Sequence, residues 1–155
     1  MKERFEFFWG GPFSQWYKHD IDVDGVTYNT AEQYMMAMKA KHFGDEAMLK
    51  NIMSTKDPQK QKAFGRKVNN FDALEWNKVS RGYVYDANLE KFQDPALKKF
   101  LMDTETKEIV EASPYDKIWG IGLGEGHPDI LDKSKWKGTN WLGEVLMKVR
   151  EDLKT

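Results

Sequence analysis

The chain has 155 residues, with 24 lysines and arginines against 25 aspartates and glutamates, and it contains no cysteine. This length suffices for a single domain with a substantial core, and the absence of cysteine excludes disulfides and zinc–thiolate sites. The formal net charge of −1 argues against a protein that grips nucleic acid over its whole surface, although a local basic patch is compatible with it. The apolar run near the N-terminus is too short for a signal peptide or a membrane span, so we expect a cytoplasmic protein without a membrane segment.

The first part of the chain predicts short strands. Residues 4–10 indicate a strand that ends at a Gly-Gly-Pro turn, and residues 12–17 indicate a loop that carries aromatic rings. Residues 21–30 alternate between apolar and polar side chains. They carry Asp24-Gly25 at their centre, which is a favourable two-residue hairpin turn.

The first helix is predicted over residues 31–43. Thr30 precedes it and Gln33 lies three residues after Thr30, which is the capping-box pattern, and Gly44 ends the helix.

Four further helices and one strand follow. Aspartates stand at the start of the helices, and two of these are followed by proline, which favours a helix start. The helices are expected at residues 45–54, 58–68, 73–92 and 96–103. A strand at 108–113, a glycine-rich segment and a helix at 140–153 complete the chain. The sequence therefore predicts one compact domain over residues 1–155, of α+β class and mainly helical, with about six helices and a few short antiparallel strands.

Two charged residues of the first helix fall on an apolar surface. Positions 32, 36, 39 and 43 form one stripe, so Glu32 and Lys39 stand beside Met36 and Phe43. In one interpretation Glu32 is a first-turn acid favoured by the helix dipole, and the Lys39 amine reaches solvent. In the other, both side chains face a polar cleft, because a buried charge needs a partner.

The segment at 115–129 has a glycine at every second position from Gly120 to Gly126, beside Asp116 and Trp119. This pattern disfavours a strand, because glycine packs no side chain and loses the most backbone entropy on ordering. The main chain must therefore turn freely there or approach something closely. Asp116 taken alone is also typical of a residue that caps a turn.

The predicted fourth helix carries Trp76 and Arg81, which by themselves are more typical of a core ring and a surface ion pair. Known cofactor motifs are missing. The three histidines lack the spacing of metal ligands, and the glycines match neither the dinucleotide fingerprint nor the phosphate loop. We therefore expect no metal and no cofactor.

Taken together, these motifs resemble the NADAR, or YbiA-like, family of N-glycosidases. The matching pieces occur in the family's order over nearly the whole length. They are FFWGGPFSQWY, YNTAEQYMMAMKAKHF, WNKVSRGYVYDANLEKF, EASPYDKIWGIG and GTNWLGEVLMKVRE. The chain departs from the family pattern at Gln15, where the family often has Asn, and at Gln33, where it often has His.

The resemblance implies the YbiA-like fold and hydrolysis of the bond between a ribose and a nitrogen base. Known family substrates are phosphorylated intermediates of the riboflavin pathway and ADP-ribosylated guanine, which can be a small molecule or part of a nucleic acid. The expected catalytic residues are Glu32, Asp116 and Lys39. The expected substrate-binding residues are Phe8, Trp9, Ser14, Trp76, Arg81, Trp119, Gly120 and Gly122.

The resemblance also agrees with the chemistry of the reaction. A carboxylate stabilises the cationic sugar of the transition state or activates water, so Glu32 and Asp116 share these two tasks in an order that the sequence leaves open. Lys39 holds a phosphate or forms an imine with the opened sugar. The tryptophans flank the base, and the glycines let the main chain approach the ligand.

Two other functions remain open at this stage. A non-catalytic module that binds ADP-ribose or a nucleotide would need the same rings and glycines, but it would not need the carboxylates for turnover. A structural protein with all of its rings in the core is the weaker alternative.

Overall fold

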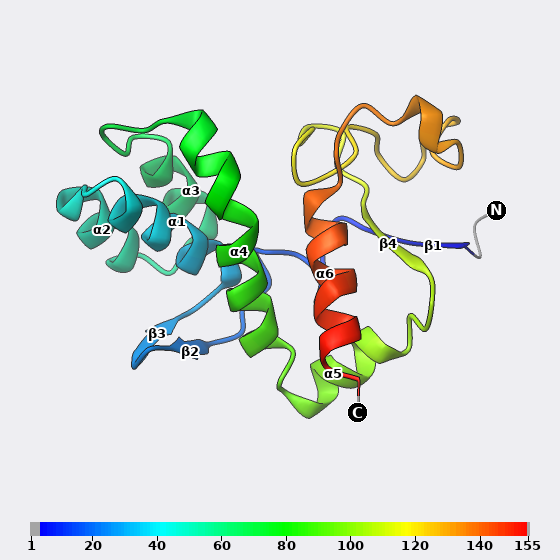
Figure 1. Cartoon of the computed structure of the whole chain (residues 1–155), viewed down its shortest axis with the longest axis horizontal. Helices are drawn as coiled ribbons and strands as arrows, with labels where there is room; N and C mark the ends of the chain where they lie inside the picture. The colour runs from blue at the N-terminus through cyan, green and yellow to red at the C-terminus, as the bar shows by residue number, and fades with distance from the viewer. Residues whose placement is uncertain (1–3, 155) are drawn as a thin grey trace. The chain divides into compact units, whose positions relative to one another are not determined.

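The structure is a computed structural model that describes residues 4–154 (Figure 1). Tertiary contacts divide the chain into two compact units, and each unit is described by itself. Unit 1 takes the described residues up to Ser14 and those from Phe92 onward, and unit 2 runs from Gln15 to Lys91.

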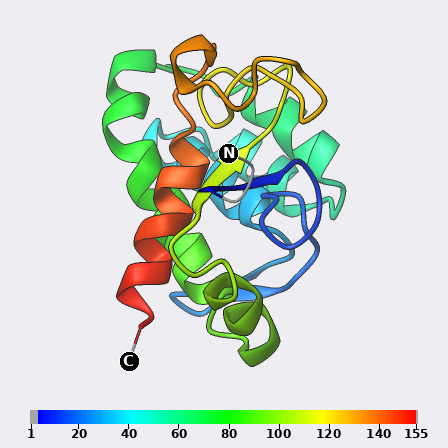
Figure 2. The same ribbon diagram turned by 90° about the vertical axis from the view of Figure 1, so that its right-hand side faces the viewer.

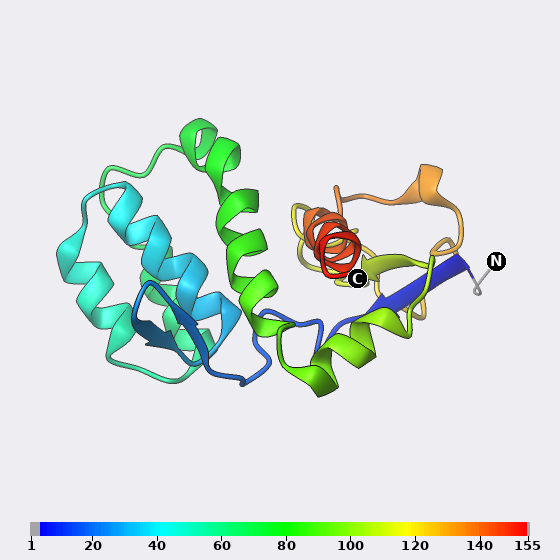
Figure 3. The ribbon, with the colours of Figure 1, turned by 60° about the horizontal axis from the view of Figure 1, so that its bottom comes forward.

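Unit 2 is a hairpin followed by four helices. Its elements are β2 (Ile21–Val23), β3 (Val26–Tyr28), α1 (Ala31–His42), α2 (Glu46–Met53), α3 (Pro58–Gly65) and α4 (Ala73–Lys91). The strands β2 and β3 pair antiparallel, and the turn residues Asp24 and Gly25 have φ angles of 52° and 83°, as the predicted two-residue turn requires. Helix α1 packs against α2, α3 and α4, so it forms the centre of the unit (Figure 3).

The caps read from the sequence are present in unit 2. The Thr30 side chain accepts a hydrogen bond from the Gln33 backbone, and the Gln33 side chain accepts one from the Asn29 backbone at 2.8 Å. Asp45 and Asp57 cap α2 and α3 in the same way. These local signals explain why each of these helices begins within a residue of its predicted start.

Unit 1 holds the second sheet and two helices. Its elements are β1 (Phe5–Phe8), α5 (Pro95–Met102), β4 (Glu108–Glu111), the 3-10 helix η2 (Lys133–Lys135) and α6 (Trp141–Asp152). Helix α6 packs on β4, and Figure 2 shows it beside the β1–β4 pair. The apolar side chains that gather around the sheet are Phe5, Val110, Ala112, Ile121, Leu123 and Ile130.

The expectation of antiparallel strands is correct for one sheet and wrong for the other. Strand β1 pairs with β4 in parallel, in a register that runs from Phe5–Glu108 to Phe8–Glu111. The two strands are far apart in the sequence, so no hairpin dictates their direction, and a long crossover makes the parallel pairing possible. With six α-helices and two two-stranded sheets in the described residues, the mainly helical α+β class is confirmed. None of the helices in residues 4–154 is both long and apolar enough to cross a membrane.

Asn140 joins α6 to the sheet through its side chain. Its Nδ2 donates to the Ile109 carbonyl and its Oδ1 accepts from the Glu111 backbone, each at 3.0 Å. The amide thus bonds to β4 as a neighbouring strand would. Gly143 makes room for it, because a Cβ atom there would lie 2.0 Å from the Ile109 oxygen and 2.3 Å from Asn140 Nδ2.

We expect Gly143→Ala to destabilise the protein, because the added methyl group forces the α6 backbone away from β4. Overpacking of this kind costs roughly 2–3 kcal/mol, which for a chain of this length lowers the Tm by about 5–10 °C. Thermal unfolding followed by circular dichroism measures the difference. Gly126→Ala is the matched control, because a Cβ atom at that position meets nothing within 4 Å. Equal Tm values for the two variants would contradict this account of α6 packing.

Candidate active site

The carboxylate of Glu32 is buried in the first turn of α1, and its residue is 6% exposed. Trp16 Nε1 donates to Glu32 Oε1 at 3.2 Å, and the Glu32 backbone N–H donates to the Gln15 carbonyl at 3.0 Å. A carboxylate removed from water is costly unless donors compensate it. The Gln15–Trp16 segment supplies one such donor, and the helix N-terminus favours the charge as well. Glu32 is therefore both a first-turn acid and a buried, oriented group.

Lys39 lies two turns further along α1 and is half-buried. Its Nζ is 4.4 Å from the centroid of the Phe71 ring. Loss of water on burial lowers the pKa of the Lys39 amine, the Glu32 carboxylate raises it, and the Arg66 guanidinium adds to the lowering. An acid and a second cation therefore both act on the Lys39 amine.

Helix α4 presents a buried stripe at every fourth residue. The stripe consists of Trp76, Ser80, Val84 and Asn88. Trp76 is 6% exposed and stacks on Tyr83, with ring centroids 5.8 Å apart and an interplanar angle of 25°. It packs as a core ring of unit 2, and its role beside a base stays a prediction. Arg81 lies on the exposed side of α4.

In unit 1, Asp116 caps a turn with one of its carboxylate oxygens. Asp116 Oδ1 accepts from the backbone N–H groups of Ile118 and Trp119, at 2.9 and 2.8 Å. The turn interpretation from the sequence is therefore correct for this oxygen. Within residues 4–154, Oδ2 has no protein hydrogen-bond partner, and the residue is only partly buried. That oxygen is able to meet water or a substrate.

The glycine segment packs against another part of the main chain. A Cβ atom at Gly120 would lie 2.6 Å from Glu111 Oε2, and one at Gly138 would lie 2.3 Å from the Gly120 carbonyl oxygen. Backbone hydrogen bonds join the two segments, from Lys137 N to Ile121 O at 2.8 Å and from Asn140 N to Gly120 O at 3.1 Å. Internal packing of unit 1 accounts for glycine at position 120 without any ligand.

Position 122 requires glycine because of its backbone conformation. Its φ is +73°, in the left-handed region, and a Cβ atom there would lie 3.0 Å from Lys137 Cβ. The predicted contact of these glycines with substrate has no support in the packing of unit 1 and stays a prediction.

The remaining predicted residues of unit 1 differ in exposure. Phe8 is 7% exposed and packs on Phe13 at 5.5 Å between centroids, so it belongs to the core. Trp9 is 59% exposed and lies 6.0 Å from the Tyr115 ring. Ser14 and Trp119 are partly buried. Of the two predicted rings Phe8 and Trp9, Trp9 is accordingly the accessible one.

The structure brings together some predicted residues and adds others. Unit 2 places Glu32 and Lys39 on one face of α1, and unit 1 places Asp116, Trp119 and Gly120 in one turn. Several polar or aromatic neighbours of these residues were not among the predicted site residues: Gln15, which was noted only as a departure from the family pattern, Trp16, Arg66, Phe71 and Asn88. The position of Asn88 could have been predicted from the sequence. It lies on the same stripe of α4 as Trp76, because the two are separated by three steps of four residues.

Known proteins are similar to this chain in sequence and in fold. A family model described as the NADAR domain matches residues 7–154, which includes residues of both units. N-glycosidase R617 of Acanthamoeba polyphaga mimivirus is 46% identical over 146 residues, covering 90% of this chain and 86% of that protein. N-glycosidase YbiA of Escherichia coli (strain K12) is 33% identical over 144 residues, covering 92% of this chain and 81% of that protein.

The fold comparison agrees with the sequence comparison. An NMR structure of the Escherichia coli protein YbiA matches with a TM-score of 0.79 at 31% identity, covering 99% of this chain and 86% of that one. The family model spans nearly the entire chain, and the relatives match along most of their own lengths. The chain therefore belongs to the NADAR family.

Proposed function

We propose that this chain is an N-glycosidase that hydrolyses the bond between a phosphorylated ribose and a nitrogen base. The relatives named above carry N-glycosidase in their names, and their similarity extends over nine-tenths of this chain, which supports the reaction class. The observation that carries the proposal is the buried Glu32 carboxylate, held by the Trp16 indole. A fold gains little stability from such a group, whereas the reaction needs one.

Glu32 is the proposed stabiliser of the cationic sugar. The departing base leaves positive charge on the sugar carbon and ring oxygen, and a fixed carboxylate in a region of low dielectric constant stabilises that charge strongly. The contact with Trp16 holds the carboxylate in place, so little reorganisation is needed during the reaction.

Asp116 is the proposed general base for water. Its Oδ1 is committed to the turn, whereas its other oxygen has no protein partner in the described part of the chain. Partial exposure gives that oxygen access to water, which suits proton abstraction.

Lys39 and Arg66 are the proposed phosphate ligands. Both are cations, and Arg66 is near enough to Lys39 to affect its pKa. Two cations beside one anion-binding position are typical of phosphate recognition. An imine role for Lys39 would make the reaction a covalent one, which carboxylate-assisted hydrolysis does not require.

We expect Glu32→Gln to reduce base release at least about 100-fold, because the carboxamide keeps an acceptor for Trp16 but loses the charge. Asp116→Asn should also slow release, roughly tenfold or more, while an oxygen still caps the turn. The measurement is liberated base by mass spectrometry, with riboflavin-pathway intermediates, ADP-ribosylated guanine in nucleic acid and free ADP-ribose conjugates as substrates.

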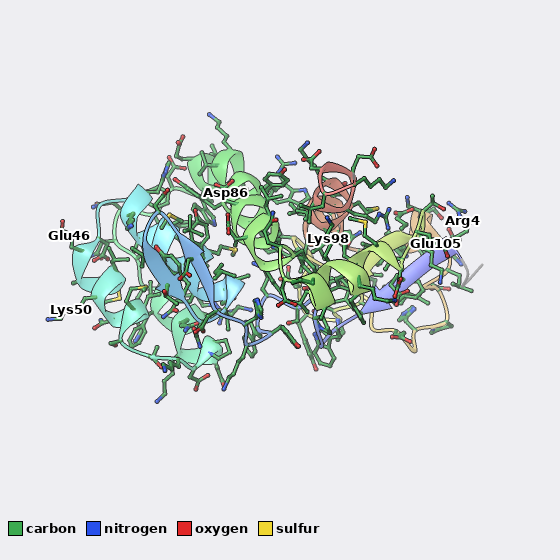
Figure 4. The ribbon with its side chains drawn as sticks, turned by 90° about the horizontal axis from the view of Figure 1, so that it is seen from below. Arg4, Glu46, Lys50, Asp86, Lys98 and Glu105 are labelled. Atoms are coloured by element: carbon green, nitrogen blue, oxygen red, sulfur yellow. The ribbon has the colours of Figure 1, made fainter. Side chains whose placement is uncertain are left out.

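Glu46→Gln is the matched control for Glu32. Glu46 is also a first-turn acid, at the start of α2, but it is exposed (Figure 4). If the Glu32 charge only interacts favourably with the helix dipole, both Glu32→Gln and Glu46→Gln will retain full activity. A Glu32→Gln protein that binds ligand but turns over at the wild-type rate would refute the catalytic assignment. An inactive wild-type protein that binds these compounds would favour the non-catalytic module.

The phosphate role of Lys39 predicts a pH dependence. The amine is charged below its pKa, and that pKa is lowered from the ordinary value of 10.5. The KM for a phosphorylated riboside should therefore rise with pH, beginning below 10.5, as the positive charge is lost. A riboside without phosphate should not show this rise. In Lys39→Arg the rise should disappear, because a guanidinium stays charged. An unchanged profile in Lys39→Arg would show that another group titrates.

A further inference from the structure

The side chain of Phe71 contacts two residues of the stripe that runs along α1 to its C-cap. The Lys39 Nζ lies 4.4 Å from the centroid of the Phe71 ring, and the Phe43 ring lies 5.4 Å from it at an interplanar angle of 69°. Lys39 and Phe43 are four residues apart, so their side chains are neighbours on one side of the helix. The Phe71 ring therefore packs across one turn, with one aromatic and one charged neighbour.

The main chain is held on both sides of Phe71, which belongs to the connection between α3 and α4. Two residues earlier, the Asn69 backbone N–H donates to Asp45 Oδ2 at 2.8 Å, and Asp45 also caps α2. One residue later, Asp72 Oδ1 accepts from the Leu74 backbone N–H at 3.0 Å, at the start of α4. The place of the ring is thus set by contacts of its own segment and does not depend on Lys39.

The Lys39 amine makes no hydrogen bond and no ion pair within residues 4–154, so the Phe71 ring is its specific contact there. A lysine side chain is long and flexible, and holding it in one place costs conformational entropy. The negative face of an aromatic ring attracts an ammonium and offsets part of this cost. The ammonium has three N–H donors, and those that point away from the ring remain for an anion.

Apolar packing explains only part of the Phe71 contacts. Phe71 is 45% exposed, so its ring is not a core ring. An aliphatic side chain would also cover Phe43, but it would not attract a cation. The contact with Lys39 is therefore the one that calls for an aromatic ring at this position.

Resting on the proposed phosphate role of Lys39, we propose that Phe71 is a positioning residue that holds the Lys39 ammonium for the phosphate group of the substrate. Phe71 acts through Lys39 and does not itself bind the phosphate. An ammonium that is already held loses less side-chain entropy on binding than a mobile one, so it binds the phosphate more tightly. Arg66, the C-cap of α3, stands at the start of the same connection and also acts on the Lys39 amine. The connection thus carries two residues that act on this amine.

The direct test measures the pKa of the Lys39 amine without substrate, by NMR of isotope-labelled lysine side chains, with Lys39→Arg to assign the signal. Pentafluorophenylalanine in place of Phe71 keeps the shape of the ring and its cover from water, but it reverses the charge distribution of the ring face. The ring then no longer favours the charged amine, so the pKa of Lys39 should fall below its wild-type value. Because the amine is charged below its pKa, the KM for a phosphorylated riboside should begin to rise at a lower pH than in the wild type.

Two ordinary substitutions separate the attraction of the ring from its bulk. Phe71→Leu should raise the KM for a phosphorylated riboside at least about threefold and leave kcat nearly unchanged, because the ground state and the transition state lose the same contact. Phe71→Trp should keep a KM close to that of the wild type, because tryptophan is the strongest ring for a cation. Apolar cover alone would be replaced better by leucine than by the larger tryptophan, and that order of KM values would overturn the proposal.

Phe100→Leu is the matched control. Phe100 of α5 is 43% exposed, nearly as much as Phe71, and its ring packs on Phe13 with the centroids 4.9 Å apart. The control should leave both the KM and the pKa of Lys39 unchanged.

An unchanged pKa of Lys39 in the pentafluorophenylalanine protein would overturn the proposal, even if Phe71→Leu does not fold. A pKa that falls while the KM keeps its wild-type pH profile would overturn it too, because the amine would then not meet the phosphate. Failure of the proposed function is a separate result, since it appears as undiminished base release by Glu32→Gln, whereas the NMR measurement needs no turnover.

Discussion

The burial of one carboxylate constrains much of unit 2. Glu32 lies in an apolar helix, and its charge is tolerable only with donors nearby. The Gln15–Trp16 segment supplies one such donor, the Trp16 indole. The Gln15 carbonyl separately accepts from the Glu32 backbone N–H, which holds the same segment on the start of α1. The Gln15 side chain then bonds to Asn88, which ties the same segment to α4. A group that is costly for folding thus contacts a loop that is itself tied to a second helix.

The local parts of the fold could be read from the sequence. Thr30, Asp45, Asp57 and Asp94 all cap the helices that they were predicted to start, because capping acts within three residues. Pairings between distant segments could not be read in this way. The parallel direction of β1 and β4 and the bond of Asn140 to β4 depend on contacts across many residues. The close approach of the main chain at Gly120 could be predicted, but its partner within unit 1, the chain near Gly138, could not. The contact of these glycines with a ligand stays a prediction.

In the candidate site too, features local in the sequence could be predicted and contacts between distant residues could not. Glu32 and Lys39 become candidates by counting along one helix, because a charge on an apolar stripe is visible at helical spacing. Their roles stay predictions. Trp16 and Arg66 were missed, since their importance comes only from what they lie beside. The two interpretations of Asp116 proved compatible, because one oxygen caps a turn and the other has no protein partner in residues 4–154. The presence of a tryptophan in the sequence does not predict whether its ring is accessible to a ligand. Trp76 is buried in unit 2, whereas Trp9 is exposed in unit 1.

The central claim is that positive charge develops on the sugar carbon while Glu32 stabilises it. The most direct measurement is the kinetic isotope effect with a phosphorylated riboside that carries deuterium on that carbon, under single-turnover conditions. The account predicts a normal effect, clearly above one, because the carbon becomes planar before water adds. An effect of one or below would contradict it, since the carbon would then remain tetrahedral or crowded in the transition state.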